Sequence, residues 1–401
     1  MPEYASKYVI IGGGLAAASA VEGIREVDER SSIAMVASER FLPYNRPPLS
    51  KKLWFGKQTV NDIWIHDAAF YARHGTDVFL GNEAVKVEPT SKVVHTSNGD
   101  TFRYEKLLLA TGGIPRMLPI DGGDLGGIYY YRYLKDYESL HAEATAGKSA
   151  IVVGGGFIGS EIAAVLRINS VNVSIIFPDD YLCARVLPVS VGMAVQQDFM
   201  QRGVRVLPNE SVESIKKDGA RFIAYTSQGR EIKSDIVIAG IGLKPGTSLA
   251  EEAGLRTDNG VLVNELLQTS HPDIYSAGDC AAFPYKALGI VTRVEHWDNA
   301  LTQGKQAGRN MAGAGEVYDY MPYFFSDLFD FGYEAVGEVD ARMETYADWQ
   351  EENKTGVIYY LRDDRIRGAM MCNVWDQVPA ARKLIQSGKK VSKTELQGVI
   401  S

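Results

Sequence analysis

The chain contains the stretch Gly12-Gly13-Gly14-Leu15-Ala16-Ala17 directly after the apolar run Tyr8-Val9-Ile10-Ile11. A second stretch, Gly154-Gly155-Gly156-Phe157-Ile158-Gly159, follows the apolar run Ala150-Ile151-Val152-Val153. Each apolar run predicts a buried strand, and the residues after each glycine cluster predict a helix. In such a unit the first glycine allows the tight turn, the second lets the backbone approach a pyrophosphate, and the third small residue lets helix and strand pack closely. Each stretch therefore predicts a dinucleotide at a helix N-terminus, where free N–H groups favour negative charge.

Two such cradles in one polypeptide predict two bound dinucleotides. The commonest reason to hold two is to pass electrons between them, so the pattern favours a flavin enzyme that uses a nicotinamide. The residues expected to form the two cradles are Gly12, Gly14, Ala17, Gly154, Gly156, Phe157, Ile158 and Gly159.

An acidic residue follows the second strand of each unit. Glu39 comes after the predicted strand 32–36, roughly 20 to 25 residues past the glycines, where it can accept hydrogen bonds from an adenosine ribose. Asp179 comes just after the predicted strand 171–177, and an acid there favours NADH because it repels the extra phosphate of NADPH. The strand itself ends in Phe177, and Arg185 is the nearest arginine that could hold a phosphate.

Further apolar runs predict additional strands for each of the two dinucleotide-binding units. The runs 107–113 and 235–242 each read as a buried strand that ends in a small-residue turn. The segment 274–276 reads as a short strand, followed by Gly278 and Asp279. This order predicts an α/β protein with an FAD-binding domain at 1–115 and 245–320, an NAD(H)-binding domain at 116–244 and a C-terminal α+β domain at 321–401.

The bulk composition is that of a globular protein, and it limits the partners. The chain has 401 residues, of which 45% are hydrophobic and 23% charged, and a formal net charge of −8. The negative charge argues against nucleic acid as a partner. No run approaches the roughly 20 apolar residues that span a bilayer. The first strand begins close to the N-terminus, which leaves no room for a signal peptide and indicates the cytoplasm.

The three cysteines, Cys183, Cys280 and Cys372, form neither a C-x-x-C nor a C-x-x-x-x-C pair. A disulfide framework, a zinc knuckle and a redox-active disulfide beside the flavin are therefore not expected. Electrons would have to leave the flavin for an acceptor outside the chain.

Several motifs resemble one family along nearly the whole chain. They are PYNRPPLSK at 43–51, ATG at 110–112, AGD at 277–279, RVEH at 293–296 and PYFFSD at 322–327. Together they resemble the family of ferredoxin reductase, apoptosis-inducing factor and monodehydroascorbate reductase. The resemblance implies two Rossmann-like domains of the glutathione-reductase-like kind plus a C-terminal α+β domain, with FAD and NADH as cofactors.

The resemblance also implies roles for single residues. Arg46 would reach the FAD pyrophosphate, and Lys51 and Glu161 would form an ion pair beside the reactive part of the flavin. Phe325 would face the flavin ring. The other residues expected to contact the cofactors are Thr111, Gly112, Asp279, Glu295, His296, Trp297 and, on the nicotinamide side, Gly242.

Two functions follow from these expectations. The first is an NADH oxidoreductase that passes electrons through FAD to a small iron–sulfur protein, a quinone or a small radical. The alternative is an NADH-sensing flavoprotein, like apoptosis-inducing factor, whose charge-transfer complex controls dimerisation or partner binding. Arg293 resembles an arginine used for the ascorbate radical, whereas Phe325 lacks the hydroxyl that a polar substrate would use. The family allows a monomer or a homodimer.

Overall fold

A computed structural model describes residues 2–400 of the chain. The chain forms two compact units, each assembled from separate segments. Unit 1 contains Met1–Asn45, Val60–Ile114 and Lys244–Pro322, and unit 2 contains Arg46–Thr59, Pro115–Leu243 and Tyr323–Ser401. The division into three domains stays a prediction, since unit 2 groups the segment 115–243 with the C-terminal residues.

A mostly parallel sheet forms the centre of unit 1, in the order β3-β2-β1-β6-β5-β4, with β19 also paired to β6. Strands β1, β2, β3, β6 and β19 pair in parallel, whereas β4 and β5 extend the sheet antiparallel. The bounds are β1 (Glu3–Ile11), β2 (Ile33–Ala37), β3 (Thr76–Leu80), β4 (Ala84–Glu88), β5 (Val93–Thr96), β6 (Thr101–Leu109) and β19 (Ile274–Ser276).

The remaining elements of unit 1 are short apart from two helices. A second sheet has the order β17-β18-β20-β21. The bounds are α1 (Leu15–Arg25), α2 (Ala68–Arg73), α6 (Ser248–Glu252), α7 (Trp297–Met311), β17 (Thr257–Asp258), β18 (Gly260–Leu262), β20 (Ala281–Tyr285) and β21 (Ile290–Arg293).

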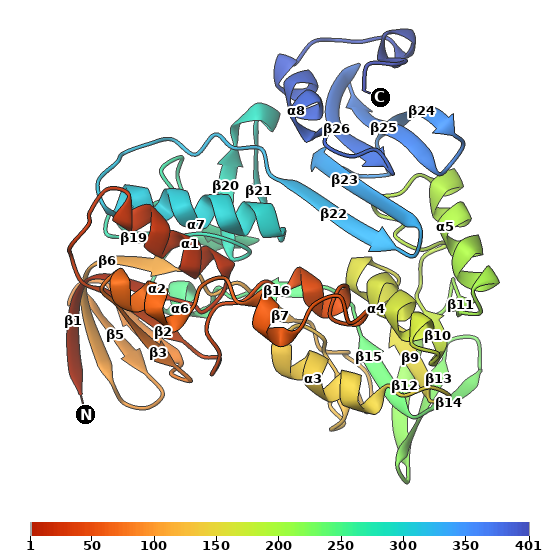
Figure 1. Ribbon diagram of the computed structural model, residues 1–401, viewed down its shortest axis with the longest axis horizontal. Helices are drawn as coiled ribbons and strands as arrows, with labels where there is room; N and C mark the ends of the chain where they lie inside the picture. The colour runs from red at the N-terminus through yellow and green to blue at the C-terminus, as the bar shows by residue number, and fades with distance from the viewer. Residues whose placement is uncertain (1, 401) are drawn as a thin grey trace. The chain divides into compact units, whose positions relative to one another are not determined.

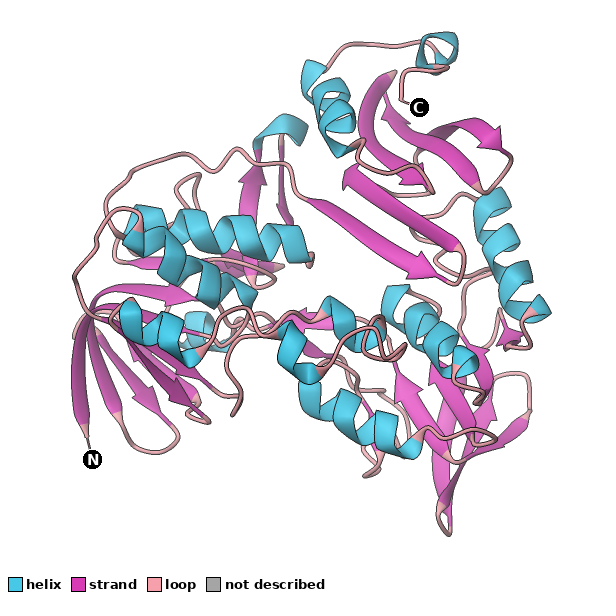
Figure 2. Ribbon diagram, in the orientation of Figure 1, coloured by secondary structure: helices cyan, strands magenta, loops and turns pink. Residues whose placement is uncertain are grey.

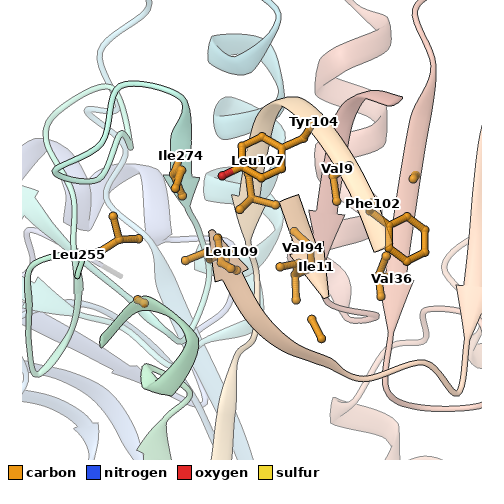
Figure 3. Packing of buried hydrophobic residues seen from close by; sticks show 14 of the residues in the cluster. Val9, Ile11, Val36, Val94, Phe102, Tyr104, Leu107, Leu109, Leu255 and Ile274 are labelled. Carbon is orange, nitrogen blue, oxygen red and sulfur yellow. The ribbon is translucent and has the colours of Figure 1, made fainter. Parts of the chain in front are cut away.

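One hydrophobic cluster of unit 1 lies on one face of its main sheet (Figure 3). Val9 and Ile11 of β1, Leu107 and Leu109 of β6, and Ile274 of β19 contribute to this cluster. Alternate residues of a strand point to the same face, which is why these positions differ by two along β1 and β6. The apolar runs recognised in the sequence are thus the buried strands at the centre of the unit.

Helices α1 and α7 pack closely because glycines lie between them (Figure 1). A Cβ atom added to Gly308 of α7 would lie 2.2 Å from the carbonyl oxygen of Ala20, and one added to Gly304 would lie 2.3 Å from that of Ala16. Gly23 of α1 makes the reciprocal approach, since its added Cβ would lie 1.9 Å from the carbonyl oxygen of Lys305. Helix α1 is therefore held against α7 backbone to backbone.

Unit 2 repeats the parallel pattern with the strand order β11-β10-β9-β15-β8. A separate antiparallel sheet, β12-β13-β14, forms the connection between β11 and β15 in sequence. The bounds are α3 (Leu134–Glu143), α4 (Phe157–Ile168), α5 (Val189–Gln201), β8 (Ile128–Tyr129), β9 (Ser149–Val153), β10 (Asn172–Ile176), β11 (Arg205–Leu207), β12 (Val212–Asp218), β13 (Arg221–Thr226), β14 (Glu231–Ser234) and β15 (Ile236–Ala239).

The C-terminal part of unit 2 is an antiparallel sheet in the order β22-β23-β26-β25-β24. Helix α8 (Val378–Ser387) packs against β23 and β26 of this sheet, as Figure 2 shows. The strands are β22 (Tyr323–Leu328), β23 (Phe331–Gly337), β24 (Glu344–Glu351), β25 (Thr355–Arg362) and β26 (Arg365–Cys372).

The α/β class with Rossmann-like parallel sheets and a β-rich C-terminal part is confirmed. The predicted strand at 274–276 coincides with β19, and the helix predicted after the second glycine stretch is α4. The strands β7 (Gly113–Pro115) and β16 (Leu243–Pro245) are where the chain passes from one unit to the other.

The contact of Gly308 with α1 makes a testable prediction about stability. Replacing it, Gly308→Ala, forces the two helices apart and should lower the free energy of unfolding by about 1–3 kcal/mol, as overpacking of a close contact does. Urea denaturation measures this change. The control is Gly126→Ala, because its added Cβ meets no atom within 4 Å. An unchanged denaturation midpoint for Gly308→Ala would contradict the packing argument.

Candidate functional site

Three loops of unit 1 meet at one edge of its parallel sheet. Leu109 at the end of β6 lies opposite Ile11 of β1 and opposite Ser276 of β19. The loops that begin at Gly12, Ala110 and Ala277 therefore leave the carboxyl ends of adjacent parallel strands. This is where open α/β sheets bind nucleotides.

The glycine stretch at this edge leaves room for a phosphate. Gly12 has φ +139°, and an added Cβ would lie 2.3 Å from the carbonyl oxygen of Ala110, so no other residue fits. Gly14 is the N-cap of α1, and an added Cβ would meet no atom within 4 Å. Within residues 2–400, no side chain caps the N-terminus of α1. Open space beside uncapped N–H groups fits the pyrophosphate of a dinucleotide.

The other residues expected at this cradle have the following partners. Glu39 accepts a hydrogen bond from the hydroxyl of the buried Tyr44, at 2.7 Å. Thr111 donates its hydroxyl to the carbonyl oxygen of Gly246 at 2.6 Å, while the amide of Gly246 donates to Gly112. Thr111 therefore ties two loops of unit 1 together.

Asp279 and the segment 295–297 are held by a network within unit 1. Arg293 donates to the carbonyl oxygen of Asp279 at 2.9 Å and pairs with Glu295 at 2.6 Å. Trp297, the first residue of α7, donates its indole N–H to Asn45 at 2.8 Å. His296 is the N-cap of α7, and its burial lowers the pKa of its ring to about 4. His296 is therefore neutral at pH 7.

The second cradle, in unit 2, has the same geometry as the first. Gly154 has φ +110°, and an added Cβ would lie 2.5 Å from the carbonyl oxygen of Gly240 at the end of β15. Gly156 is the N-cap of α4, and an added Cβ would meet no atom within 4 Å. The Gly159 position is close to the strand, since its added Cβ would lie 2.0 Å from the carbonyl oxygen of Gly154. The neighbouring Ile158 is an exposed apolar residue, 42% accessible.

The strand β10 is followed directly by Phe177 and not by an acidic residue. Phe177 is buried against Gly155, and Asp179 is exposed. The carbonyl oxygen of Asp179 accepts the amide of Asn209, and that of Phe177 accepts the amide of Glu210. Glu210 is buried and pairs with Arg230. The acids beside this strand end are thus Asp179, as predicted, and Glu210, which the sequence pattern did not indicate.

The predicted ion pair between Lys51 and Glu161 is present and buried. The Lys51 Nζ lies 2.5 Å from Glu161 Oε1, and the two residues are only 8% and 5% exposed. Two serine hydroxyls also donate to this carboxylate, from Ser50 and Ser326, each at 2.5 Å. Sequence reasoning missed both serines, although each stands inside a quoted motif, beside Lys51 and Phe325.

Three more predicted residues belong to unit 2: Phe325, Arg46 and Gly242. The Lys51 Nζ lies 5.7 Å from the centre of the Phe325 ring. Arg46 donates to the carbonyl oxygen of Arg132 at 2.9 Å, and its guanidinium lies 5.3 Å from the centre of the Tyr133 ring. At Gly242, φ is +95° and the carbonyl oxygen accepts the amide of Arg116. Their roles toward a cofactor stay predictions.

The cysteines are free and buried. Burial raises the pKa of Cys183 to about 12, and it raises the pKa of Cys372 as well. Among the described residues, no group of His, Cys, Asp and Glu side chains could hold a metal ion. No helix in that same part of the chain is long and apolar enough to cross a membrane.

Comparison with known families agrees with this geometry. The model of the family described as "Pyridine nucleotide-disulphide oxidoreductase" matches residues 6–304. The chain belongs to this family. It is an oxidoreductase that uses FAD and NAD(P)H. A second model, "Apoptosis-inducing factor, mitochondrion-associated, C-term", matches residues 307–355 and 347–387.

Similar proteins include two reductases that act on different substrates and one solved reductase complex. The ferredoxin–NAD(+) reductase component of the anthranilate 1,2-dioxygenase system of Burkholderia cepacia is 34% identical, over 96% of this chain and 95% of that protein. The monodehydroascorbate reductase of Solanum lycopersicum is 29% identical, over 92% of each. The solved covalent putidaredoxin reductase–putidaredoxin complex has a TM-score of 0.91 at 28% identity, covering 99% of this chain and 96% of that one. The family expected from the sequence is confirmed.

The two open N-caps can be tested separately. Gly14→Ala places a methyl group where a phosphate of FAD would lie, so FAD affinity should fall at least about tenfold (about 1.4 kcal/mol). Gly156→Ala should leave FAD bound and raise the dissociation constant for NADH by a similar factor. Flavin absorbance per protein and NADH titration measure the two effects. If both variants lose FAD equally, the assignment of one cradle to each cofactor is wrong.

The neutral His296 makes stability depend on pH. Its pKa is about 4 in the folded chain and 6.5 when unfolded. Between these values the unfolded state binds a proton that the folded state does not, so stability is lost as pH falls from 6.5 to 4. The His296→Asn variant should lose stability less steeply, by about 1 kcal/mol per pH unit. Equal slopes in urea denaturation across this window would rule out the lowered pKa of His296.

Proposed function

We propose that this chain is an NADH-dependent reductase that passes electrons through FAD to a small iron–sulfur protein. The observation that carries the proposal is the buried Lys51–Glu161 pair in the unit that contains the second nucleotide cradle. Glu161 is in α4, whose N-cap is Gly156, so the pair lies on the helix that begins at the cradle. The ferredoxin reductase among the relatives and the putidaredoxin complex among the structures support the kind of acceptor.

The chain's residues would supply binding and orientation. The chemistry that a bound FAD would supply is the acceptance of a hydride from the nicotinamide and the release of single electrons to a one-electron acceptor. The cradle at Gly12 and Gly14 would hold the FAD phosphates, and the one at Gly154 and Gly156 those of NADH. Lys51 would place a positive charge beside the flavin, and Glu161 would keep that charge oriented.

The cysteines favour an acceptor outside the chain. No two of the three cysteines have the spacing of a redox-active pair. Burial keeps the Cys183 thiol protonated at pH 7, because its pKa is raised to about 12. A protonated, buried thiol is a poor nucleophile and a poor relay.

The position of Arg293 favours an iron–sulfur protein over the ascorbate radical. Its guanidinium pairs with Glu295, donates to the carbonyl oxygen of Asp279, and its side chain is 9% exposed. A side chain so enclosed has little surface to offer a small substrate. Together with the missing hydroxyl at Phe325, this argues for a docked protein acceptor.

The C-terminal match supports a second candidate, an NADH sensor. The model named after apoptosis-inducing factor covers the segment that contains β22 to α8. Such a sensor needs the same cradles and the same Lys51–Glu161 pair, but it holds the reduced flavin for a long time. The lifetime of the reduced state separates the two functions.

Stopped-flow reduction followed by turnover with different acceptors tests the proposal. NADH should bleach the flavin at least about tenfold faster than NADPH, because the exposed Asp179 would repel a 2′-phosphate. A [2Fe–2S] ferredoxin, coupled to cytochrome c, should give a kcat/KM at least about tenfold above those for a quinone or the ascorbate radical. If the reduced flavin instead persists in air for minutes and NADH changes the oligomeric state, the sensor is the correct function.

A further inference from the structure

The Glu161 carboxylate is held at both oxygens. Oε1 accepts from Lys51 Nζ and from the Ser326 hydroxyl, each at 2.5 Å. Oε2 accepts from the Ser50 hydroxyl, also at 2.5 Å. All four side chains are at least nine-tenths buried. A desolvated carboxylate needs such donors to stay charged, and two hydroxyls on opposite oxygens also fix the plane of the group.

Strand β22 contacts this ion pair with three successive residues. Phe325 lies with its ring centre 5.7 Å from Lys51 Nζ, and Asp327 Oδ2 lies 3.8 Å from the same atom. Ser326, between them, bonds Glu161. The ammonium of Lys51 thus has a second carboxylate within reach, and the Asp327 side chain is 55% exposed.

The backbone around Ser326 is held firmly. Ser326 pairs with Tyr333 across the antiparallel strands β22 and β23, and Tyr333 is fully buried. A residue in the interior of a paired strand has little freedom to move. The Ser326 hydroxyl is therefore attached to a fixed backbone through a single Cα–Cβ bond, whereas the Glu161 and Lys51 side chains have several rotatable bonds between backbone and charge.

We propose that Ser326 is a positioning residue for the reduction of the flavin. Its hydroxyl holds Oε1 of Glu161, the oxygen that accepts from Lys51, and thereby keeps the ammonium at one place. Ser50 does the same at Oε2. This inference rests on the proposed function, because it assumes that Lys51 acts on the flavin.

The test is the rate of flavin reduction by NADH in the FAD-loaded full chain. Ser326→Ala should lower the limiting rate about tenfold, the rate equivalent of one hydrogen bond to a charged group. The NADH concentration at half-saturation and the FAD content should change less than about twofold. This split separates positioning from a loss of folding or of cofactor binding. Ser50→Ala should behave in the same way.

A double-mutant cycle with Lys51→Ala shows whether Ser326 acts through the lysine. In the Lys51→Ala background, Ser326→Ala should slow reduction further by less than about twofold. The matched control is Ser234→Ala, a buried serine of β14 that donates to the carbonyl oxygen of Ile236 at 2.9 Å, and its rate should equal that of the parent protein.

The outcomes are distinguishable. If the unmodified protein is not reduced by NADH, the proposed function fails, whatever the serine variants do. If it is reduced but Ser326→Ala reacts within twofold of it, the positioning role is wrong. The role is also wrong if Ser234→Ala slows reduction as much as Ser326→Ala does. It is wrong, too, if Ser326→Ala slows reduction by the same factor in the Lys51→Ala background as in the parent protein.

Discussion

The close approach of backbone to backbone at Gly12 and Gly154 is the constraint on which both nucleotide cradles depend. In each case the glycine between strand and helix has a positive φ, and an added Cβ would lie within 2.5 Å of the carbonyl oxygen of the residue that follows the neighbouring strand. Only glycine satisfies both conditions. The helix then begins at once, so its uncapped N–H groups lie at the carboxyl edge of the sheet.

The same constraint explains how other loops reach the cradle of unit 1. Because β1, β6 and β19 are parallel and in register, the segments after Leu109 and Ser276 leave the sheet beside Gly12. Gly278 then passes α1 closely, since its added Cβ would lie 3.0 Å from Cβ of Ala16. Small residues at these loops allow the approach, and larger residues such as Asp279 are brought to the same edge.

The sequence predicted those helices and strands whose limits depend on neighbouring residues alone. The helices predicted after the two glycine stretches correspond to Leu15–Arg25 and Phe157–Ile168, because each begins at a glycine turn and has an apolar face. The Lys51–Glu161 contact came from a family resemblance. Ser50 and Ser326 are 111 and 165 residues from Glu161 in sequence, and no periodicity links positions so distant. The grouping of 46–59 with unit 2 likewise depends on tertiary packing.

Stability alone does not account for the buried Lys51–Glu161 pair. Removing two charges from water costs several kcal/mol per ion, and apolar residues of similar volume often serve stability as well or better. Two segments distant from α4 in sequence nevertheless supply three donors to this one carboxylate: Ser50 and Lys51 from 50–51, and Ser326 from β22. An arrangement that needs so many partners to offset desolvation is expected where the charge itself is used, as beside a cofactor that gains negative charge on reduction. The pairing of Ser326 with the buried Tyr333 therefore holds in place a residue that bonds Glu161 and, through Glu161, orients Lys51.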